Sequence, residues 1–193
     1  MSTTAMNPMS FRNRIHPHKF ALYASFASII MMFGALTSAY IVKHAAGDWL
    51  EYKMPSIFYV STAVLILSSI VLHTSYIGFK RKKEAVYKGM LIVAFILGIA
   101  FVVLQYQGWQ ILFASGMDLK ANVSASFLYL ITGLHAAHIL GGVAAITVAI
   151  IHAFTLPFIV TEKRRIRFQL VLHYWHFVDI LWIYLLAFLL LVK

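Results

Sequence analysis

The chain has 193 residues, of which 62% are hydrophobic and only 11% are charged, and its formal net charge is +10. A soluble domain of this size cannot hide so much apolar surface, so the composition indicates a polytopic membrane protein. The lack of cysteine excludes disulfides, zinc–thiolate sites, iron–sulfur clusters and copper centres held by thiolates. The positive charges bracket apolar segments, which indicates membrane topology and anionic-lipid contacts in place of a nucleic-acid partner.

Five apolar runs are each long enough to cross about 30 Å of hydrocarbon as a helix. They cover approximately residues 20–42, 56–79, 87–114, 124–154 and 170–192. Backbone groups in lipid must be hydrogen-bonded within their own segment or in a closed barrel, and the runs lack the alternation of barrel strands. We therefore expect an all-α fold with five transmembrane helices in a single domain over 20–193, preceded by a cytoplasmic segment over 1–19.

The basic residues predict the orientation of these helices. Twelve of the sixteen Lys and Arg residues lie in the N-terminal segment and in the second and fourth connections, which share one side of the membrane. These connections include Arg81, Lys82, Arg164 and Arg165, which we expect to contact lipid headgroups. The positive-inside rule then places the N-terminus in the cytoplasm and the C-terminus in the periplasm.

The first and fourth runs are rich in small residues, which let helix backbones approach closely in lipid. Two interpretations stay open, either packing within this chain or docking onto a larger partner. The small residues are Ser25, Ala27, Ser28, Gly34, Ala35, Ser38 and Ala39 in the first run, and Gly133, Ala136, Ala137, Gly141, Gly142, Ala144 and Ala145 in the fourth.

The last two runs carry ionisable side chains at helical spacing. His135 and His138 are three residues apart, as are His173, His176 and Asp179. A carboxylate at membrane depth costs at least about 2.5–3.5 kcal/mol, so Asp179 is expected to have a partner or a function. We interpret the five residues as a polar cluster that fixes helix register, with Asp179 bonded to histidines or to an indole on the last two helices. A proton relay and a lipid or partner contact are the alternatives.

Two other functions are compatible with these residues. His138 and His176 are candidates to hold a b-type haem between facing helices, which would make the chain a membrane redox protein. Alternatively, Asp179 is the candidate coupling site of a small transporter. A di-iron carboxylate site is disfavoured, because it needs several inward-facing acids and the runs contain only one.

Four motifs resemble the cytochrome c oxidase subunit III family and follow in the family's order. Residues 173–182 read HYWHFVDILW, against the family's W-Y-W-H-F-V-D-V-V-W. Residues 133–139 resemble G-x-H-G-x-H-V, residues 97–105 resemble L-G-x-x-F-x-x-L-Q, and residues 61–69 resemble N-T-x-x-L-L-x-S-S. The resemblance runs from about Lys19 to the end of the chain. Within the motifs we expect packing roles for Gly133, Trp175, Trp182 and Gln105.

The chain departs from the family pattern in two respects. Long members have seven helices, and the five runs correspond to the short bacterial form. The family also often has carboxylates at two positions that align here with Ser28 and Gly108. Both are associated with the lipid cleft or the proton-entry region, so their absence disfavours a direct proton-relay role for this chain.

The resemblance implies a non-catalytic accessory subunit III of a bacterial haem–copper terminal oxidase in the inner membrane. It implies that the chain stabilises the catalytic subunit I, contacts subunit II and a small subunit IV, and binds phospholipid. No catalytic, metal or cofactor site is expected in the chain, because haem and copper belong to the partner subunits. The electron donor, cytochrome c or quinol, and membership of a respiratory supercomplex stay open.

Overall fold

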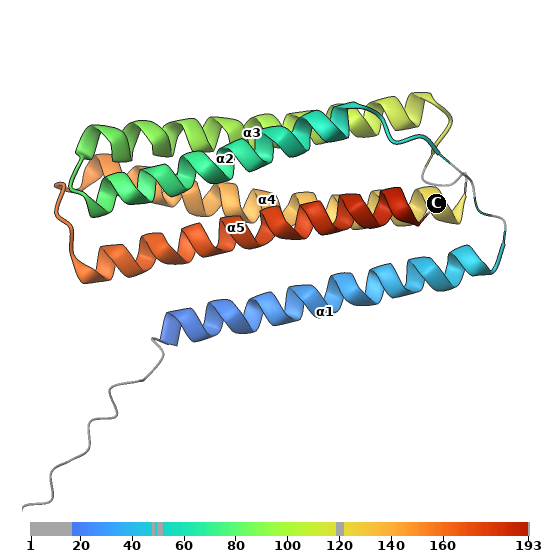
Figure 1. The fold of residues 1–193 in the computed structure, drawn as a ribbon, viewed down its shortest axis with the longest axis horizontal. Coiled ribbons are helices and arrows are strands. Elements are labelled where there is room, and N and C mark those ends of the chain that lie inside the picture. Colours follow the sequence, from blue (N-terminus) through green and yellow to red (C-terminus); the bar gives the residue numbers. More distant parts are fainter. Residues whose placement is uncertain (1–16, 48, 50–51, 119–121, 193) are drawn as a thin grey trace, which may run out of the picture.

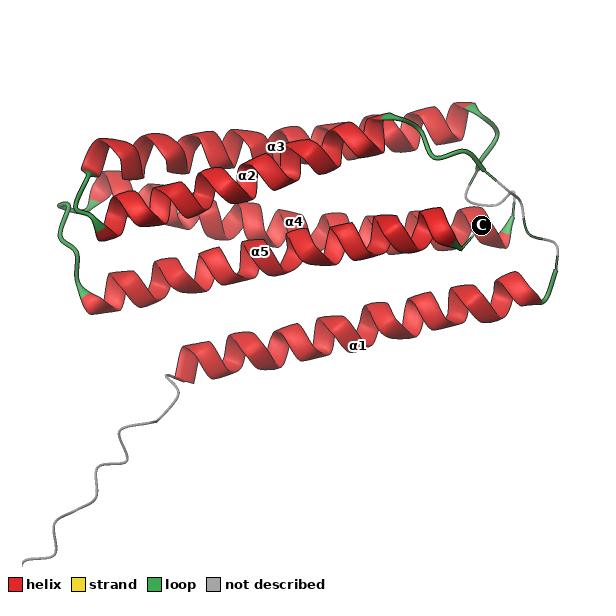
Figure 2. Ribbon diagram, viewed as in Figure 1, coloured by secondary structure: helices red, strands yellow, loops and turns green. Residues whose placement is uncertain are grey.

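The computed structural model describes residues 17–47, 49, 52–118 and 122–192, and in them the chain forms five α-helices. These helices are α1 (Pro17–Ala45), α2 (Ile57–Lys80), α3 (Glu84–Ala114), α4 (Val123–Thr155) and α5 (Glu162–Leu191). Each is long and apolar enough to cross a membrane. The predicted all-α fold with five spanning helices is therefore confirmed (Figures 1 and 2). Most of the predicted N-terminal segment lies outside the described residues.

Helices α2 to α5 form a four-helix bundle, and α1 lies along its outside (Figure 1). In the bundle each helix contacts the next one along the chain, and α5 closes the ring by contacting α2. Helix α1 contacts only α4 and α5 among the described elements. Its contacts centre on Phe33 and Tyr40, which pack with residues from α4 and α5. The bundle core and the α1 interface are thus two separate clusters of buried side chains.

One end of the bundle gathers most of the basic residues, and we call it the basic end. It comprises the start of α1, the α2–α3 turn, the end of α4 and the start of α5. The α2–α3 turn is short and closes with a bond from Lys83 N to Gly78 O of 2.9 Å. Lys82 adopts a left-handed φ of 58° there. This tight turn forces α2 and α3 to run side by side in opposite directions.

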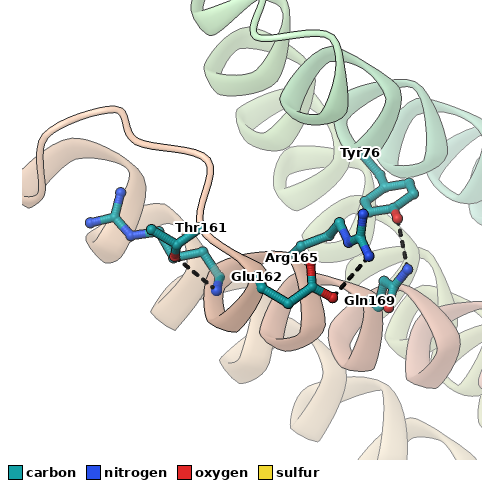
Figure 3. Close-up of polar contacts among 6 residues, drawn as sticks. Tyr76, Thr161, Glu162, Arg165 and Gln169 are labelled. Carbon is teal, nitrogen blue, oxygen red and sulfur yellow. Dashed lines mark hydrogen bonds and ion pairs between the residues drawn. The ribbon is translucent and has the colours of Figure 1, made fainter.

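The structure corrects the predicted start of the last helix, which begins at Glu162 and not at residue 170. Thr161 caps the helix by accepting a hydrogen bond from Arg164 N at 3.3 Å. The side chains of Glu162 and Arg165 then pair at 2.8 Å across the first turn (Figure 3). The apolar run predicted only the part of the helix within hydrocarbon, whereas the capped and paired turns extend it toward solvent. The basic residues expected in a loop therefore lie on α5.

Trp175 occupies a slot between α3 and α4 that two glycines make possible. The indole is fully buried. A Cβ added at Gly98 would lie 2.9 Å from Trp175 Cη2, and one added at Gly142 would lie 2.8 Å from its Cε3. Interior packing in lipid depends on such close approaches, because hydrophobicity alone does not drive helices together there. Gly133 differs, since a Cβ at that position would meet nothing within 4 Å. The structure therefore shows no packing contact for Gly133.

We predict that Gly142→Ala destabilises the protein, because the added methyl group collides with a large, enclosed indole. Overpacking of this kind costs about 1–3 kcal/mol. Gly133→Ala, on the same helix, is the matched control and should leave stability unchanged. The measurement is the thermal unfolding temperature of the purified protein in detergent. Equal effects of the two variants would show that the slot does not constrain Trp175.

Candidate functional site

Helix α2 carries two rows of polar side chains that repeat every seven residues. One row consists of Ser61, Ser68 and Ser75, and the other of Thr62, Ser69 and Tyr76. Seven residues are nearly two full turns, so each row stays on one face of the helix. The rows lie about 100° apart around α2, because their members are adjacent in sequence. Two different neighbouring helices can therefore be contacted by polar groups along almost the whole length of α2.

The first row faces α3 and is fully buried. Ser61 Oγ accepts a hydrogen bond from Gln105 Nε2 at 3.0 Å. Ser68 Oγ donates to Ala94 O at 3.1 Å, and Ser75 Oγ donates to Tyr87 O at 2.7 Å. These small residues let the backbones of α2 and α3 approach and connect them at the same time. Gln105 therefore links two helices as well as packing.

The second row faces α5. Trp182 Nε1 donates to Thr62 Oγ1 at 2.9 Å, and Ser69 Oγ shares a hydrogen bond with His176 Nδ1. Near the basic end, Gln169 Nε2 donates to Tyr76 Oη at 2.8 Å (Figure 3). The three bonds form a ladder along the antiparallel α2–α5 seam, and they fix the register of α5 against α2.

His176 belongs to this ladder and not to a cluster with the histidines of α4. Its Nε2 lies 3.4 Å from Nδ1 of His73, an exposed residue of α2. His138 donates from Nδ1 to Leu134 O of its own helix at 2.7 Å. The described contacts therefore do not join these histidines into the expected α4–α5 polar cluster. Trp175 points toward α4, and successive residues of a helix are about 100° apart around its axis. His176 therefore points toward α2.

His135 and Asp179 are buried and have no hydrogen-bond partner among the described residues. The His135 ring instead stacks on Trp182, with centroids 4.9 Å apart, and meets the Phe101 ring edge-on at 6.1 Å. Neither carboxylate oxygen of Asp179 meets the geometry of a hydrogen bond to a described residue. The Ser69 hydroxyl on α2 lies near enough to interact with this carboxylate, but the hydrogen bond that meets the geometric criteria joins Ser69 to His176. The expected bonds from Asp179 to histidines or an indole are therefore absent from the described part of the chain.

The surroundings of His173 differ from those of the other four residues. It is half-buried beside Tyr23 of α1, with ring centroids 6.4 Å apart. Its Nδ1 is buried without a partner in the described part of the chain. The three regularly spaced residues His173, His176 and Asp179 therefore have three different surroundings. His173 faces α1, His176 faces α2, and Asp179 lies between the positions of Trp175 and Trp182.

The two positions where the family often has carboxylates have different surroundings. Gly108 is buried, and a Cβ there would lie 2.9 Å from the Phe58 ring. Phe58 thus fills the space that an acidic side chain would need. Ser28 is exposed on α1 and donates to Ala24 O of its own helix at 3.2 Å. Restoring a carboxylate would therefore require repacking at Gly108 but not at Ser28.

The four basic residues predicted to contact headgroups lie at the basic end. Arg81 and Lys82 are exposed in the α2–α3 turn. Arg164 Nη1 donates to Pro157 O at 2.6 Å and to Ile159 O at 3.3 Å, which ties down the α4–α5 connection. Arg165 is paired with Glu162. No group of three or more His, Asp or Glu side chains within the described ranges is placed to hold a metal ion.

Comparisons with known proteins agree with the motifs. A family model described as cytochrome c oxidase subunit III matches residues 51–192. Cytochrome c oxidase subunit 3 of Corynebacterium diphtheriae is 29% identical over 162 residues, which cover 80% of this chain and 78% of that protein. The probable subunit 3 of Mycobacterium tuberculosis is 28% identical, with coverages of 81% and 79%. That of Rickettsia prowazekii is 27% identical, with coverages of 86% and 60%.

The ladder predicts different effects on stability for substitutions at two residues of α5 that are three positions apart. His176→Leu should lower the unfolding temperature of the purified protein, because it removes contacts to Ser69 and His73. Interhelical hydrogen bonds in membranes are worth about 0.6 kcal/mol on average, and about 1.7 at most. Asp179→Asn should leave the unfolding temperature unchanged, because no described residue is hydrogen-bonded to the carboxylate. A larger loss for Asp179→Asn than for His176→Leu would show that Asp179 holds the helices together.

Proposed function

The chain belongs to the cytochrome c oxidase subunit III family, and on that basis we propose that it is a non-catalytic accessory subunit of a bacterial haem–copper terminal oxidase. In this role it stabilises the catalytic subunit I, contacts subunit II and a small subunit IV, and carries no redox centre of its own. The haem and copper reside in the partner subunits. The complex reduces oxygen and pumps protons, with cytochrome c or quinol as its electron donor.

The observation that carries this proposal is the use of the motif residues inside the bundle. Trp175 fills the glycine slot, Trp182 joins α5 to α2 and stacks on His135, and Gln105 joins α3 to α2. A cavity of about 340 Å³ lies between the end of α4 and the start of α5, and no residue of the four motifs lines it. Side chains that serve packing and register in this way suit a scaffold better than a reaction centre.

The outward surface supports association within the membrane. Large apolar side chains are exposed along the helices, and the exposed fraction is 75% for Met31, 67% for Ile180 and 66% for Val42. Lipid and the neighbouring apolar faces of subunit I would cover them. Helix α1, held only by α4 and α5 among the described elements, leaves the larger part of its surface for such contacts.

The proposed orientation places the basic end in the cytoplasm and the C-terminus in the periplasm, across the bacterial inner membrane. Arg81 and Lys82 then lie at headgroup depth and are exposed to anionic lipid. Arg165 is paired with Glu162, and Arg164 holds the α4–α5 connection through one nitrogen. Among the four predicted headgroup contacts, Arg81 and Lys82 are therefore the ones with free side chains within the described structure.

One observation favours a second candidate role, in which Asp179 exchanges protons. Its carboxylate is buried without a hydrogen bond to any described residue, beside a path of polar groups that leads through Ser69 and His176 to the exposed His73. If Asp179→Asn left assembly intact but slowed proton uptake by the oxidase, this role would apply. The missing family carboxylates at Ser28 and Gly108 disfavour it.

The test is gentle purification of the tagged chain from its own membrane, followed by a spectrum and identification of the partners. We predict co-purification of a larger haem-containing subunit, whereas the chain separated from its partners should show no Soret band. A Soret band that stays with the isolated chain, and is lost in His138→Ala or His176→Ala, would contradict the accessory role. It would support the haem-binding alternative instead.

A further inference from the structure

Two histidines meet on the outer side of the α2–α5 seam. Nδ1 of His73 lies 3.4 Å from Nε2 of His176. The ring centroids are 5.6 Å apart, and the ring planes are tilted by 36°. His73 is exposed, and His176 is partly buried. The two nitrogen atoms therefore face each other at a place that a small ion can reach from outside the bundle.

The separation of these nitrogens fits a shared metal ion better than a hydrogen bond. Hydrogen bonds donated by nitrogen mostly join atoms about 2.7–3.2 Å apart. Zinc binds histidine nitrogen at about 2.0–2.1 Å and prefers a tetrahedral arrangement, in which two ligand atoms are about 3.3–3.4 Å apart. The pair thus already has the spacing of two ligands of one tetrahedral ion.

Ser69 holds His176 in the orientation that a metal ligand needs. Its hydroxyl shares a hydrogen bond with Nδ1 of His176. When Nδ1 carries the ring proton, Nε2 presents its lone pair on the side of His73. Metal-binding histidines almost always have such a partner at their second nitrogen, because it fixes both the tautomer and the ring orientation.

An acidic side chain lies behind the pair. Asp179 is buried, and neither of its oxygens meets the geometry of a hydrogen bond to a described residue. The Ser69 hydroxyl lies near enough to interact with it. A divalent ion at the two histidines would attract this carboxylate across Ser69. The isolated acid would then have the compensating charge that an ionisable group at membrane depth requires.

The depth of the pair also calls for a ligand. From His73 to Lys80, the last residue of α2, the helix rises about 10 Å. Ionisable side chains on membrane-spanning helices rarely face outward at such a depth without a partner. The hydrogen-bonded pair of Tyr76 and Gln169 lies between the histidines and the basic end (Figure 3). Polar groups therefore follow the seam from the histidines toward water, which gives an ion a route of entry.

We propose that His73 and His176 bind one Zn²⁺ ion, or another divalent ion that prefers imidazole, with water as the remaining ligands. Ser69 acts as a positioning residue for His176. No third His, Asp or Glu within the described ranges joins the pair. The site therefore exchanges its ion more readily than the three- and four-ligand zinc sites do. The bound ion connects α2 to α5, and the site does not depend on the proposed oxidase role, because this chain alone supplies it.

The experiment measures Zn²⁺ binding to the full chain by isothermal titration calorimetry. The chain is purified in a mild detergent with a tag that contains no histidine, and a chelator removes metal beforehand. His73→Gln removes one ligand at an exposed position and leaves the bond between Ser69 and His176 in place. His152→Gln is the matched control, since it replaces an exposed histidine on α4, a helix that does not contact α2 among the described elements. Mg²⁺, which prefers oxygen ligands, is the comparison ion.

We expect one Zn²⁺ ion per chain to depend on the histidine pair. Ser69→Ala should weaken its binding by about tenfold or more, because loss of an outer partner of a metal-bound histidine costs about 10–100-fold in affinity. His73→Gln should weaken it at least as much. His152→Gln should bind as the unmodified chain does, and Mg²⁺ should not compete. Equal Zn²⁺ affinity of His73→Gln and the unmodified chain, or no binding by the unmodified chain, would overturn the proposal.

The unfolding temperature gives a second readout, which a purely structural role of the histidines would not move. Zn²⁺ should raise it in the unmodified chain and in His152→Gln, because an ion that binds only the folded state stabilises that state. The same rise in His73→Gln would contradict the site. X-ray absorption at the zinc edge should show two imidazole ligands at about 2.0–2.1 Å. Zinc without imidazole neighbours would also overturn the proposal.

Discussion

The arrangement of this protein depends on the polar rows of α2. A helix in lipid has no hydrophobic driving force toward its neighbours, so close packing and interhelical hydrogen bonds must select them. Helix α2 meets this constraint with pairs of adjacent polar residues at 61–62, 68–69 and 75–76, which direct one row to α3 and the other to α5. The seven-residue repeat keeps both rows on their faces over the whole span.

The register that α2 imposes explains the roles of the motif residues on α5. With Trp182 bonded to Thr62, the rest of that helix face points into the bundle, and Trp175 enters the slot at Gly98 and Gly142. His176, one residue further on, faces α2. Asp179 is left in the interior without a bond among the described residues. A single helix rotation therefore accounts for the two buried indoles, the bonded histidine and the isolated acid.

The sequence predicted the number and type of the helices, because long apolar runs leave lipid-embedded backbone no other structure. It did not predict the start of α5, where a threonine cap and an ion pair extend the helix beyond the hydrocarbon. Nor did it predict the polar partners, because spacing along α4 and α5 gives the face of each residue but not the neighbour that this face meets. A usable signal existed in the repeated polar pairs of α2, which point to two neighbouring helices.

The central claim, that hydrogen bonds from α2 fix the register of α5, is tested most directly by a double-mutant cycle on Thr62 and Trp182. Stability would be measured for Thr62→Val, Trp182→Phe and the double variant by denaturant unfolding in mixed micelles. The account predicts a coupling of about 0.6 kcal/mol or more between the two sites, because each single variant breaks the same bond. Strictly additive effects would contradict it and leave packing alone as the determinant of register.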